Sequence, residues 1–222
     1  MNAPRLLAFA AGWALTASAL AGTQPDGASI ARLGNGHGVA PCAACHNANG
    51  SGQAAAGFPR LAGLPAAYLL KQLDDFASGA RRNATMQPVA SGLSPAERKL
   101  MADYYSTLPV PAPAAPAAPM DAASKALAET LSTQGRWSKG LPACSQCHGP
   151  GGVGVGDHFP PLAGQSAVYI ANQLHAWQHG TRHNDPLHLM KTVASKLDAA
   201  DIAAISAWYA SQPATGKGGA SP

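Results

Sequence analysis

Two short segments, 102 residues apart, contain the residues whose types and spacing indicate the most specific chemistry. Each has two cysteines separated by two residues and followed at once by a histidine: Cys42-Ala-Ala-Cys45-His46 and Cys144-Ser-Gln-Cys147-His148. In such a segment each thiol can form a thioether with a vinyl group of a porphyrin, and the imidazole can bind the iron. The pattern predicts two covalently attached haem c groups, in which the four cysteines hold the porphyrins and His46 and His148 hold the irons.

Two other interpretations of paired cysteines fit less well. A four-thiolate zinc site would need both pairs, but their separation is far longer than the usual spacing in zinc ribbons. A thioredoxin-like redox pair would need alternating strands and helices, which the sequence does not show. Because all four cysteines belong to the two motifs, none is left for a structural disulfide, a thiol nucleophile or a thiolate ligand to iron.

The elements that must position these motifs occur twice, because one unit of about 100 residues is duplicated. The matched pairs, with the first copy named first, are Phe58-Pro-Arg-Leu-Ala-Gly63 and Phe159-Pro-Pro-Leu-Ala-Gly164, Tyr68 to Leu73 and Tyr169 to Leu174, Arg81 and Arg182, and Asn83 and Asn184. Two small domains, each built around one haem, are therefore expected.

Each copy divides into helices, and no segment has a convincing strand pattern. The first helix is expected at about 28–33 and again at 122–134, and the second at 66–77 and 167–179, closing near Gly79 and Gly180. The last helix begins with a capping signature, Ser94-Pro-Ala-Glu97 in one copy and Asp198-Ala-Ala-Asp201 in the other. The fold class is therefore expected to be all-α, in two tandem domains.

The duplication also indicates the second axial ligand of each iron. Of the five methionines, only Met86 and Met190 match one another, each seven residues before the leucine that precedes the last helix. Both are expected in loops, where a thioether could reach the other face of the haem and raise its potential. The second copy has three extra residues before its methionine, which leaves His188 as the main rival ligand there and His183 as a weaker one.

Composition changes mark the segment boundaries. Residues 1–21 have one positive charge, an apolar run of about 15 residues and a small-x-small cleavage site, which predict a secretory signal peptide. A proline- and alanine-rich stretch, 109–120, indicates a linker between the N-terminal domain, 22–108, and the C-terminal domain, 121–213. The tail, 214–222, is rich in glycine and serine and is expected to be disordered. Export to the periplasm agrees with haem attachment, which bacteria perform after translocation.

Net charge gives little information about partners. The formal charge of the whole chain is +4, and 12% of its residues are charged. Removal of the signal peptide and addition of four ionised haem propionates would bring the net charge to about −1 with both irons reduced. No run of Lys or Arg forms a basic patch, so a nucleic-acid partner is not expected.

With these motifs the chain resembles the dihaem cytochrome c4 family, which implies an all-α fold of two tandem class I cytochrome c-like domains joined by the Pro/Ala-rich linker. The resemblance rests on two tandem copies of C-x-x-C-H, F-P-x-L-A-G, Y-x-x-x-Q-L and a methionine ahead of a capped final helix, and it spans about 26–212. It implies domains that face one another through their haem propionates, and iron ligation by Met86 and Met190. It also implies electron transfer in the periplasm between an upstream donor and a membrane-bound terminal oxidase. Peripheral association with the membrane would be compatible with such partners.

The expected function is therefore that of a periplasmic dihaem electron carrier, not an enzyme. The rival is a dihaem redox enzyme of the peroxidase type, which would need an open or displaceable sixth position on one iron. A third interpretation is a cytochrome subunit of a larger dehydrogenase. Absorption spectra distinguish the first two, because methionine bound to ferric haem gives a weak band at the red edge of the visible.

Overall fold

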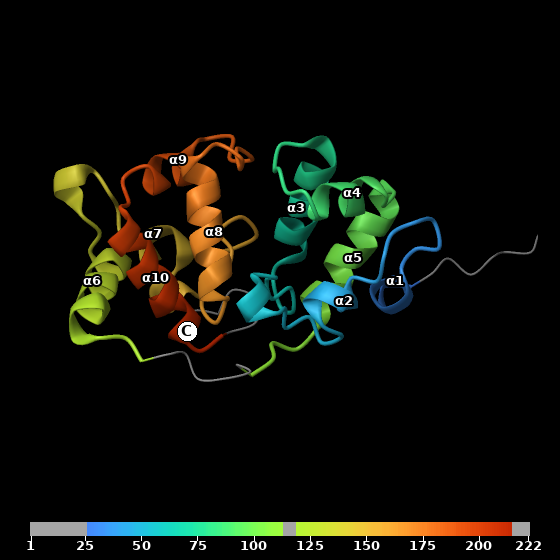
Figure 1. The fold of residues 1–222 in the computed structure, drawn as a ribbon, viewed down its shortest axis with the longest axis horizontal. Coiled ribbons are helices and arrows are strands. Elements are labelled where there is room, and N and C mark those ends of the chain that lie inside the picture. Colours follow the sequence, from blue (N-terminus) through green and yellow to red (C-terminus); the bar gives the residue numbers. More distant parts are fainter. Residues whose placement is uncertain (1–25, 113–118, 215–222) are drawn as a thin grey trace, which may run out of the picture.

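The computed structural model describes residues 26–112 and 119–214, and these form two helical domains (Figure 1). The N-terminal domain contains α1 (Gly27–Leu33), α2 (Ala43–His46), η1 (Ala54–Ala56), α3 (Ala66–Ser78), α4 (Met86–Ser91) and α5 (Pro95–Thr107). The C-terminal domain contains α6 (Ala122–Thr133), η2 (Trp137–Lys139), α7 (Ser145–His148), η3 (Pro150–Gly152), α8 (Ala167–Gln178), α9 (Leu189–Ala194) and α10 (Ala199–Ser211). Within the described ranges only isolated β-bridges occur, so the all-α expectation is confirmed.

In each domain the last helix packs against both the first helix and the long helix that follows the F-P-x-L-A-G segment. In the N-terminal domain α5 contacts α1 and α3, and in the C-terminal domain α10 contacts α6 and α8. The approach of α1 to α5 is close, since a Cβ added at Gly27 would lie 2.7 Å from Tyr104 Cβ. The repeated sequence therefore folds into a repeated structure, and each half has its own apolar core.

The capping signatures position the last helix of each domain as the sequence predicted. The Ser94 side chain accepts a hydrogen bond from the Glu97 amide, and the Glu97 carboxylate accepts one from the Ser94 amide. Asp198 and Asp201 form the same reciprocal pair at the start of α10. These bonds satisfy amide donors that would otherwise lack a partner in the first turn of the helix.

Several segments assigned from composition lie wholly or partly outside the described residues. They are the signal peptide, 1–21, the central part of the linker, 113–118, and all but the first residue of the tail, 214–222. The described parts of the linker, 109–112 and 119–120, contain no helix. Among residues 26–112 and 119–214, no helix has the length and apolar character needed to span a membrane.

The two capping boxes differ in one respect that predicts a difference in stability. Asp201 is buried, and Arg136 donates to both of its carboxylate oxygens at 2.7 and 2.8 Å, whereas Glu97 forms its cap at an exposed position. Replacing Asp201→Asn breaks an ion pair whose carboxylate is buried and whose guanidinium is partly exposed, and should lower the free energy of unfolding by about 2 kcal/mol. The matched change Glu97→Gln should cost under about 0.5 kcal/mol, because an amide can still accept the capping bond. Unfolding in guanidinium chloride measures both variants, and equal losses of unfolding free energy would contradict this difference between the two caps.

The same ion pair predicts a pH dependence. Burial alone would raise the pKa of Asp201, but the hydrogen bonds from Arg136 and from the Asp198 amide outweigh it and lower the pKa below its usual value. The stabilisation is therefore complete above the unfolded-state pKa of about 3.9 and is lost as pH falls below it toward the lower folded-state pKa. Unfolding curves at pH 7 and pH 3 should show a smaller effect of Asp201→Asn at pH 3.

Candidate haem sites and the interface between them

Both motif histidines are buried and held in one orientation by a backbone carbonyl. The Nδ1 atom of His46 lies 3.0 Å from the carbonyl oxygen of Pro59, and the Nδ1 atom of His148 lies 2.9 Å from that of Pro160. A ring that donates from Nδ1 keeps its other nitrogen, Nε2, available as a ligand. Burial lowers the pKa of both imidazoles, which favours the neutral form that can bind iron. The geometry therefore fits axial ligation.

The repeated F-P-x-L-A-G segment has the same role in both domains, because in each it connects the haem motif to the last helix. The Gly50 carbonyl accepts hydrogen bonds from the amides of Leu61 and Ala62, and the Gly63 amide donates to the Tyr105 carbonyl. The C-terminal domain repeats this pattern with Gly152, Leu162, Ala163, Gly164 and Tyr209. Gly152 has a φ of +79°, and an added Cβ would lie 2.4 Å from the Tyr209 ring, so a larger residue would push the last helix away.

The four cysteines are half-buried, and each pair belongs to a different domain. Cys42 packs against the N-terminal core, and Cys144 packs against the C-terminal core. Burial raises the pKa of the Cys42 thiol, and it raises that of the Cys144 thiol to about 11. No cluster of three or more His, Cys, Asp or Glu side chains occurs among the described residues. The thiols therefore do not meet as a four-thiolate zinc site would require.

Met86 and Met190 occupy equivalent places, but not in loops. Each lies in the first turn of a six-residue helix, Met86 as the first residue of α4 and Met190 as the second residue of α9. The loop expectation is therefore wrong in detail: the loop precedes each methionine, and a side chain at its end fixes the methionine backbone. Asn83 Oδ1 accepts from the Met86 amide at 2.8 Å, and Asp185 Oδ2 accepts from the Met190 amide at 2.6 Å.

The rival ligand His188 has a different environment from Met190. His188 is exposed, with a φ of +54°, at the residue that precedes α9. Met190 is half-buried and packs against the same core cluster as Cys144. The surroundings therefore favour Met190 over His188 as the second iron ligand.

The largest feature that the sequence interpretation missed lies between the domains. Arg81 and Arg182 face each other in an antiparallel bridge and are only 5% and 8% exposed. Each guanidinium contacts polar groups of both domains: Arg81 donates to Tyr169 and Gln72, and Arg182 donates to Gln173 and Gln72. Each also lies over an aromatic ring of its own domain, Phe76 at 4.5 Å and Trp177 at 4.7 Å. The repeated arginines were visible in the alignment of the two copies, but nothing in the sequence showed that they meet.

These two cations lack a matching pair of anions among the described residues. Their hydrogen-bond partners are neutral amides and phenols, and the nearby Asp75 carboxylate is bound by Lys71 and by Asn184. Burial and the charge of Arg81 lower the pKa of Arg182, whereas Tyr169, Tyr68 and Asp75 together outweigh burial and raise the pKa of Arg81. Such a pair is costly unless an anion accompanies it. Haem propionates are anions of this kind, so the residues present fit two haems whose propionates reach the interface between the domains.

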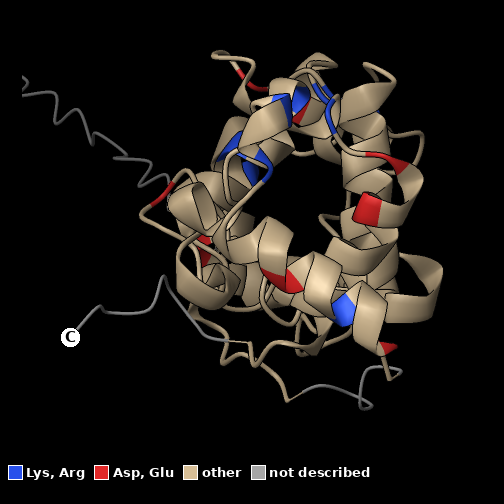
Figure 2. Ribbon diagram, turned by 90° about the vertical axis from the view of Figure 1, so that its left-hand side faces the viewer, with Lys and Arg blue, Asp and Glu red and all other residues tan. Residues whose placement is uncertain are grey.

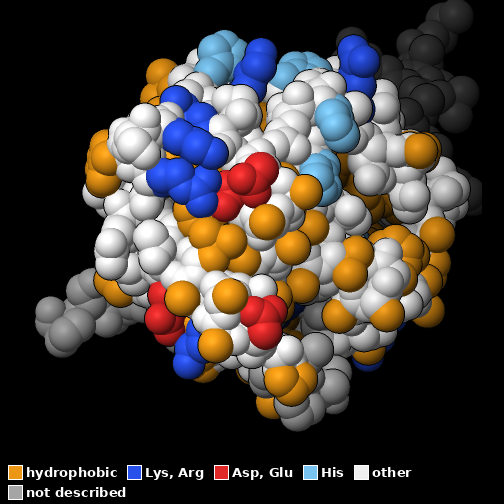
Figure 3. Space-filling view, turned by 60° about the vertical axis from the view of Figure 1, so that its left-hand side comes forward, with side chains coloured by type: hydrophobic (Ala, Val, Ile, Leu, Met, Phe, Trp, Pro, Cys, Tyr) orange, Lys and Arg blue, Asp and Glu red, His pale blue; other side chains and the backbone are white. Residues whose placement is uncertain are grey.

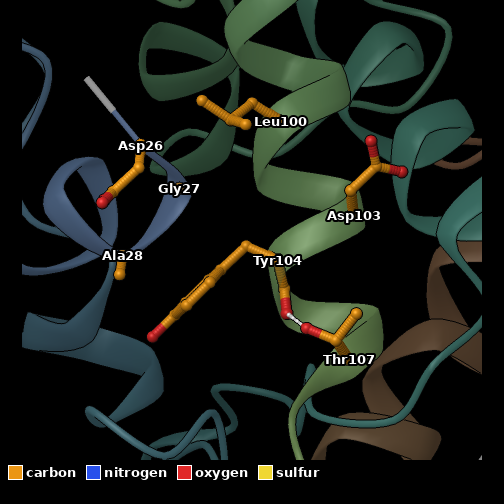
Figure 4. A pocket seen from close by; sticks show the side chains of 7 residues that line it. All are labelled: Asp26, Gly27, Ala28, Leu100, Asp103, Tyr104 and Thr107. Carbon is orange, nitrogen blue, oxygen red and sulfur yellow. Dashed lines mark hydrogen bonds between the residues drawn. The ribbon is translucent and has the colours of Figure 1, made fainter. Parts of the chain in front are cut away.

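Other surface features do not resemble a haem site. The pocket in Figure 4 lies between α1 and α5 and is lined by Asp26, Gly27, Ala28, Leu100, Asp103, Tyr104 and Thr107, none of which is a motif residue. In Figure 2 the acidic segments are scattered over the ribbon, whereas most of the Lys and Arg segments in view lie toward its upper left. Figure 3 shows histidines and basic side chains near an apolar area on one face.

Comparison with known proteins agrees with this architecture. A family model described as cytochrome c matches residues 33–109 and 138–212, one match in each domain. Cytochrome c4 of Pseudomonas aeruginosa is 39% identical over 172 residues, which cover 77% of this chain and 83% of the relative. The solved structure of reduced cytochrome c4 from Pseudomonas stutzeri has a TM-score of 0.70 and 36% identity, and the match covers 77% of this chain and 93% of that one.

This chain belongs to the dihaem cytochrome c4-like family. Two cytochrome c domains mean two covalently bound haem c groups, as the motifs predicted. Another relative, described as a thiosulfate dehydrogenase electron acceptor from Thiomonas intermedia, is 52% identical over 176 residues, 79% of this chain and 80% of the relative. The structure of a thiosulfate dehydrogenase (TsdBA) from Marichromatium purpuratum has a TM-score of 0.78 and 42% identity. That match covers 84% of this chain but only 40% of the larger one.

The interface of this cytochrome c4-like chain gives a prediction about domain association. The Arg82 amide donates to the Thr181 carbonyl and the His183 amide to the Ala80 carbonyl, so both amides are protected only while the domains are docked. Replacing Arg81→Met removes its hydrogen bonds to the other domain and should speed exchange of these two amides by about tenfold or more. Hydrogen exchange followed by NMR of the reduced protein measures this.

Arg82→Met is the matched control, because it removes the same charge from an exposed neighbour. It should leave the exchange rate of the His183 amide unchanged. Equal acceleration in both variants would show that the buried guanidinium does not hold the domains together.

Proposed function

We propose that this protein is a periplasmic carrier that takes single electrons from a thiosulfate dehydrogenase and passes them to a respiratory acceptor. The main support for the proposal is the order of sequence identity among its relatives. Two proteins described as thiosulfate dehydrogenase electron acceptors are 52% and 46% identical to it, whereas four described as cytochrome c4 are 37–39% identical. The similarity to part of a solved thiosulfate dehydrogenase adds support. A terminal oxidase as the acceptor stays a prediction from the family resemblance.

In this proposal the chain holds each iron from both faces. Cys42, Cys45, Cys144 and Cys147 would anchor the two haems. His46 and Met86 would hold the iron of the N-terminal domain, and His148 and Met190 would hold that of the C-terminal domain. Bound haem supplies a one-electron Fe(II)/Fe(III) couple. The protein orients each imidazole through a proline carbonyl, fixes each methionine backbone through a polar side chain, and surrounds the site with apolar residues.

The fixed methionines favour a carrier over an enzyme. A peroxidase-type enzyme needs a sixth position that a substrate can occupy. Here the amide of each methionine is hydrogen-bonded at the start of a helix, which restricts movement of the residue away from the haem. The protein is therefore proposed to exchange electrons with a dehydrogenase rather than to oxidise thiosulfate itself.

The ligand assignment is tested with a pair of neighbouring variants. Met190→Ala should reduce the weak red-edge band of the oxidised protein by about half, because one of two thioether ligands is lost, and should allow carbon monoxide to bind one reduced haem. His188→Ala, two residues away and exposed, should leave both properties unchanged. The reverse result would make His188 the ligand.

The proposed partner is tested by following haem absorbance in a mixture of purified components. The oxidised holoprotein, the Thiomonas intermedia thiosulfate dehydrogenase and thiosulfate should together give rapid reduction of the haems. Thiosulfate alone should give none. The Pseudomonas aeruginosa cytochrome c4 serves as the matched control and should be reduced more slowly at the same concentration.

Two outcomes would contradict the proposal. Reduction by thiosulfate without the dehydrogenase would show that the protein is an enzyme. Failure of the complete mixture to reduce the holoprotein faster than the control would leave it a general dihaem carrier with another donor.

Export is tested through haem attachment. Deleting residues 2–21 should keep the chain on the cytoplasmic side of the membrane, where the bacterial attachment apparatus does not act, and should give a protein without covalent haem. The full chain, expressed in the same host, should be recovered from the periplasmic fraction with both haems. Covalent haem on the truncated chain would contradict the assignment of 1–21 as a signal peptide.

A further inference from the structure

One peptide group in the N-terminal domain connects the proximal histidine to the other domain. The carbonyl of the Pro59–Arg60 peptide accepts the hydrogen bond from His46 Nδ1 at 3.0 Å. The N–H of this same peptide group donates to the side-chain oxygen of Gln165, also at 3.0 Å. Gln165 belongs to the C-terminal domain and is 4% exposed, and its amide nitrogen donates in turn to the Arg60 carbonyl at 3.1 Å. A continuous chain of hydrogen bonds therefore runs from Gln165 to His46.

The C-terminal domain does not have this connection. Its corresponding peptide group joins Pro160 to Pro161, so its carbonyl accepts from His148 but its nitrogen carries no hydrogen. The residue equivalent to Gln165 in the first copy is Leu64, which is buried and has an apolar side chain. Both the donor and the acceptor are thus missing from the second site. The two haem sites differ at these two positions within an otherwise matched motif.

This difference has a definite electronic direction. When the N–H of a peptide group donates a hydrogen bond, its carbonyl oxygen becomes a stronger acceptor, because hydrogen bonds along one chain polarise each other. A stronger acceptor at Nδ1 makes the imidazole a better electron donor to the metal. More electron donation stabilises Fe(III) relative to Fe(II) and lowers the reduction potential.

We propose that Gln165 is a positioning residue that lowers the reduction potential of the N-terminal haem across the domain interface. It acts through the Pro59–Arg60 peptide and His46, and the C-terminal haem has no equivalent. Docking of the domains therefore makes the two haems unequal, and the electron is biased toward the C-terminal haem. The proposal rests on His46 as an iron ligand, but not on thiosulfate dehydrogenase as the donor.

The guanidinium of Arg60 acts in the opposite direction and must stay constant in the test. Burial lowers its pKa to about 10, so the group stays charged at neutral pH. It donates to the carbonyls of Ala62 and Ala163 at 2.6 and 3.1 Å. A nearby cation favours Fe(II), so substitution of Arg60 would mix two effects of opposite sign. Substitution of Gln165 removes no charge; besides its bonds to Arg60, it removes only the bond that the Gln165 side-chain oxygen accepts from the Ser166 amide.

The test is Gln165→Leu, which places at this position the residue that the N-terminal copy already uses. Spectroelectrochemical titration of the holoprotein should show the potential of the N-terminal haem rising while that of the C-terminal haem stays unchanged. The equilibrium constant for electron exchange between the haems should change by about two- to tenfold. In the reduced protein, the NMR signal of His46 Nδ1–H should move upfield because its hydrogen bond is weaker, and the His148 signal should not move. Gln165→Met, closer in shape to glutamine, should give the same directions.

Ser166→Ala is the matched control at the interface. The Ser166 hydroxyl donates across the domains to the Ala54 carbonyl at 3.0 Å but does not touch the Pro59–Arg60 peptide. It should leave both potentials and the His46 signal unchanged. Equal shifts of both haems in Gln165→Leu, no shift of the N-terminal haem, or the same shift in Ser166→Ala would overturn the proposal. The low-spin spectrum of the unaltered holoprotein reports separately whether both irons have their axial ligands.

Discussion

The hydrogen bond between each motif histidine and a proline carbonyl is the contact on which both haem sites depend. It gives the two ring nitrogens different roles: Nδ1 donates a hydrogen bond to the protein, and Nε2 is left for iron. The carbonyl can take this place only because the same segment is bonded to the loop after the motif and to the last helix. Helices α2 and α7 have four residues each and could not hold the histidine by helical structure alone.

A second constraint is the burial of two like charges between the domains. Arg81 and Arg182 are stabilised by amides, phenols and aromatic faces drawn from both halves of the chain. Their net positive charge suits an interface that also receives propionates. The same docking of the domains brings Gln165 of one domain to the Pro59–Arg60 peptide of the other.

Much of this structure could be predicted from local sequence patterns. Cysteine and histidine spacing identified the cofactor, the matched copies identified the domains, and the serine and aspartate caps located the last helices within a residue. The place of Met86 and Met190 in short helices was not predicted. Asn83 accepts from the amides two and three residues on, as an N-cap residue does, but Asp185 accepts from the Met190 amide five residues on, which is not a standard capping distance. The meeting of Arg81 with Arg182 and the contact of Gln165 with Arg60 were also missed. Both join residues about 100 positions apart, and only the docking of the domains shows them.

Coulometric titration of the purified protein under carbon monoxide tests the central claim most directly, namely two irons that are each held from both faces. Two electrons should be taken up for each chain, and the spectrum of the fully reduced protein should be the same with and without carbon monoxide. Uptake of fewer than two electrons would mean that one motif carries no haem. A spectrum altered by carbon monoxide would mean that one sixth position is open, and the protein would then not be a simple carrier.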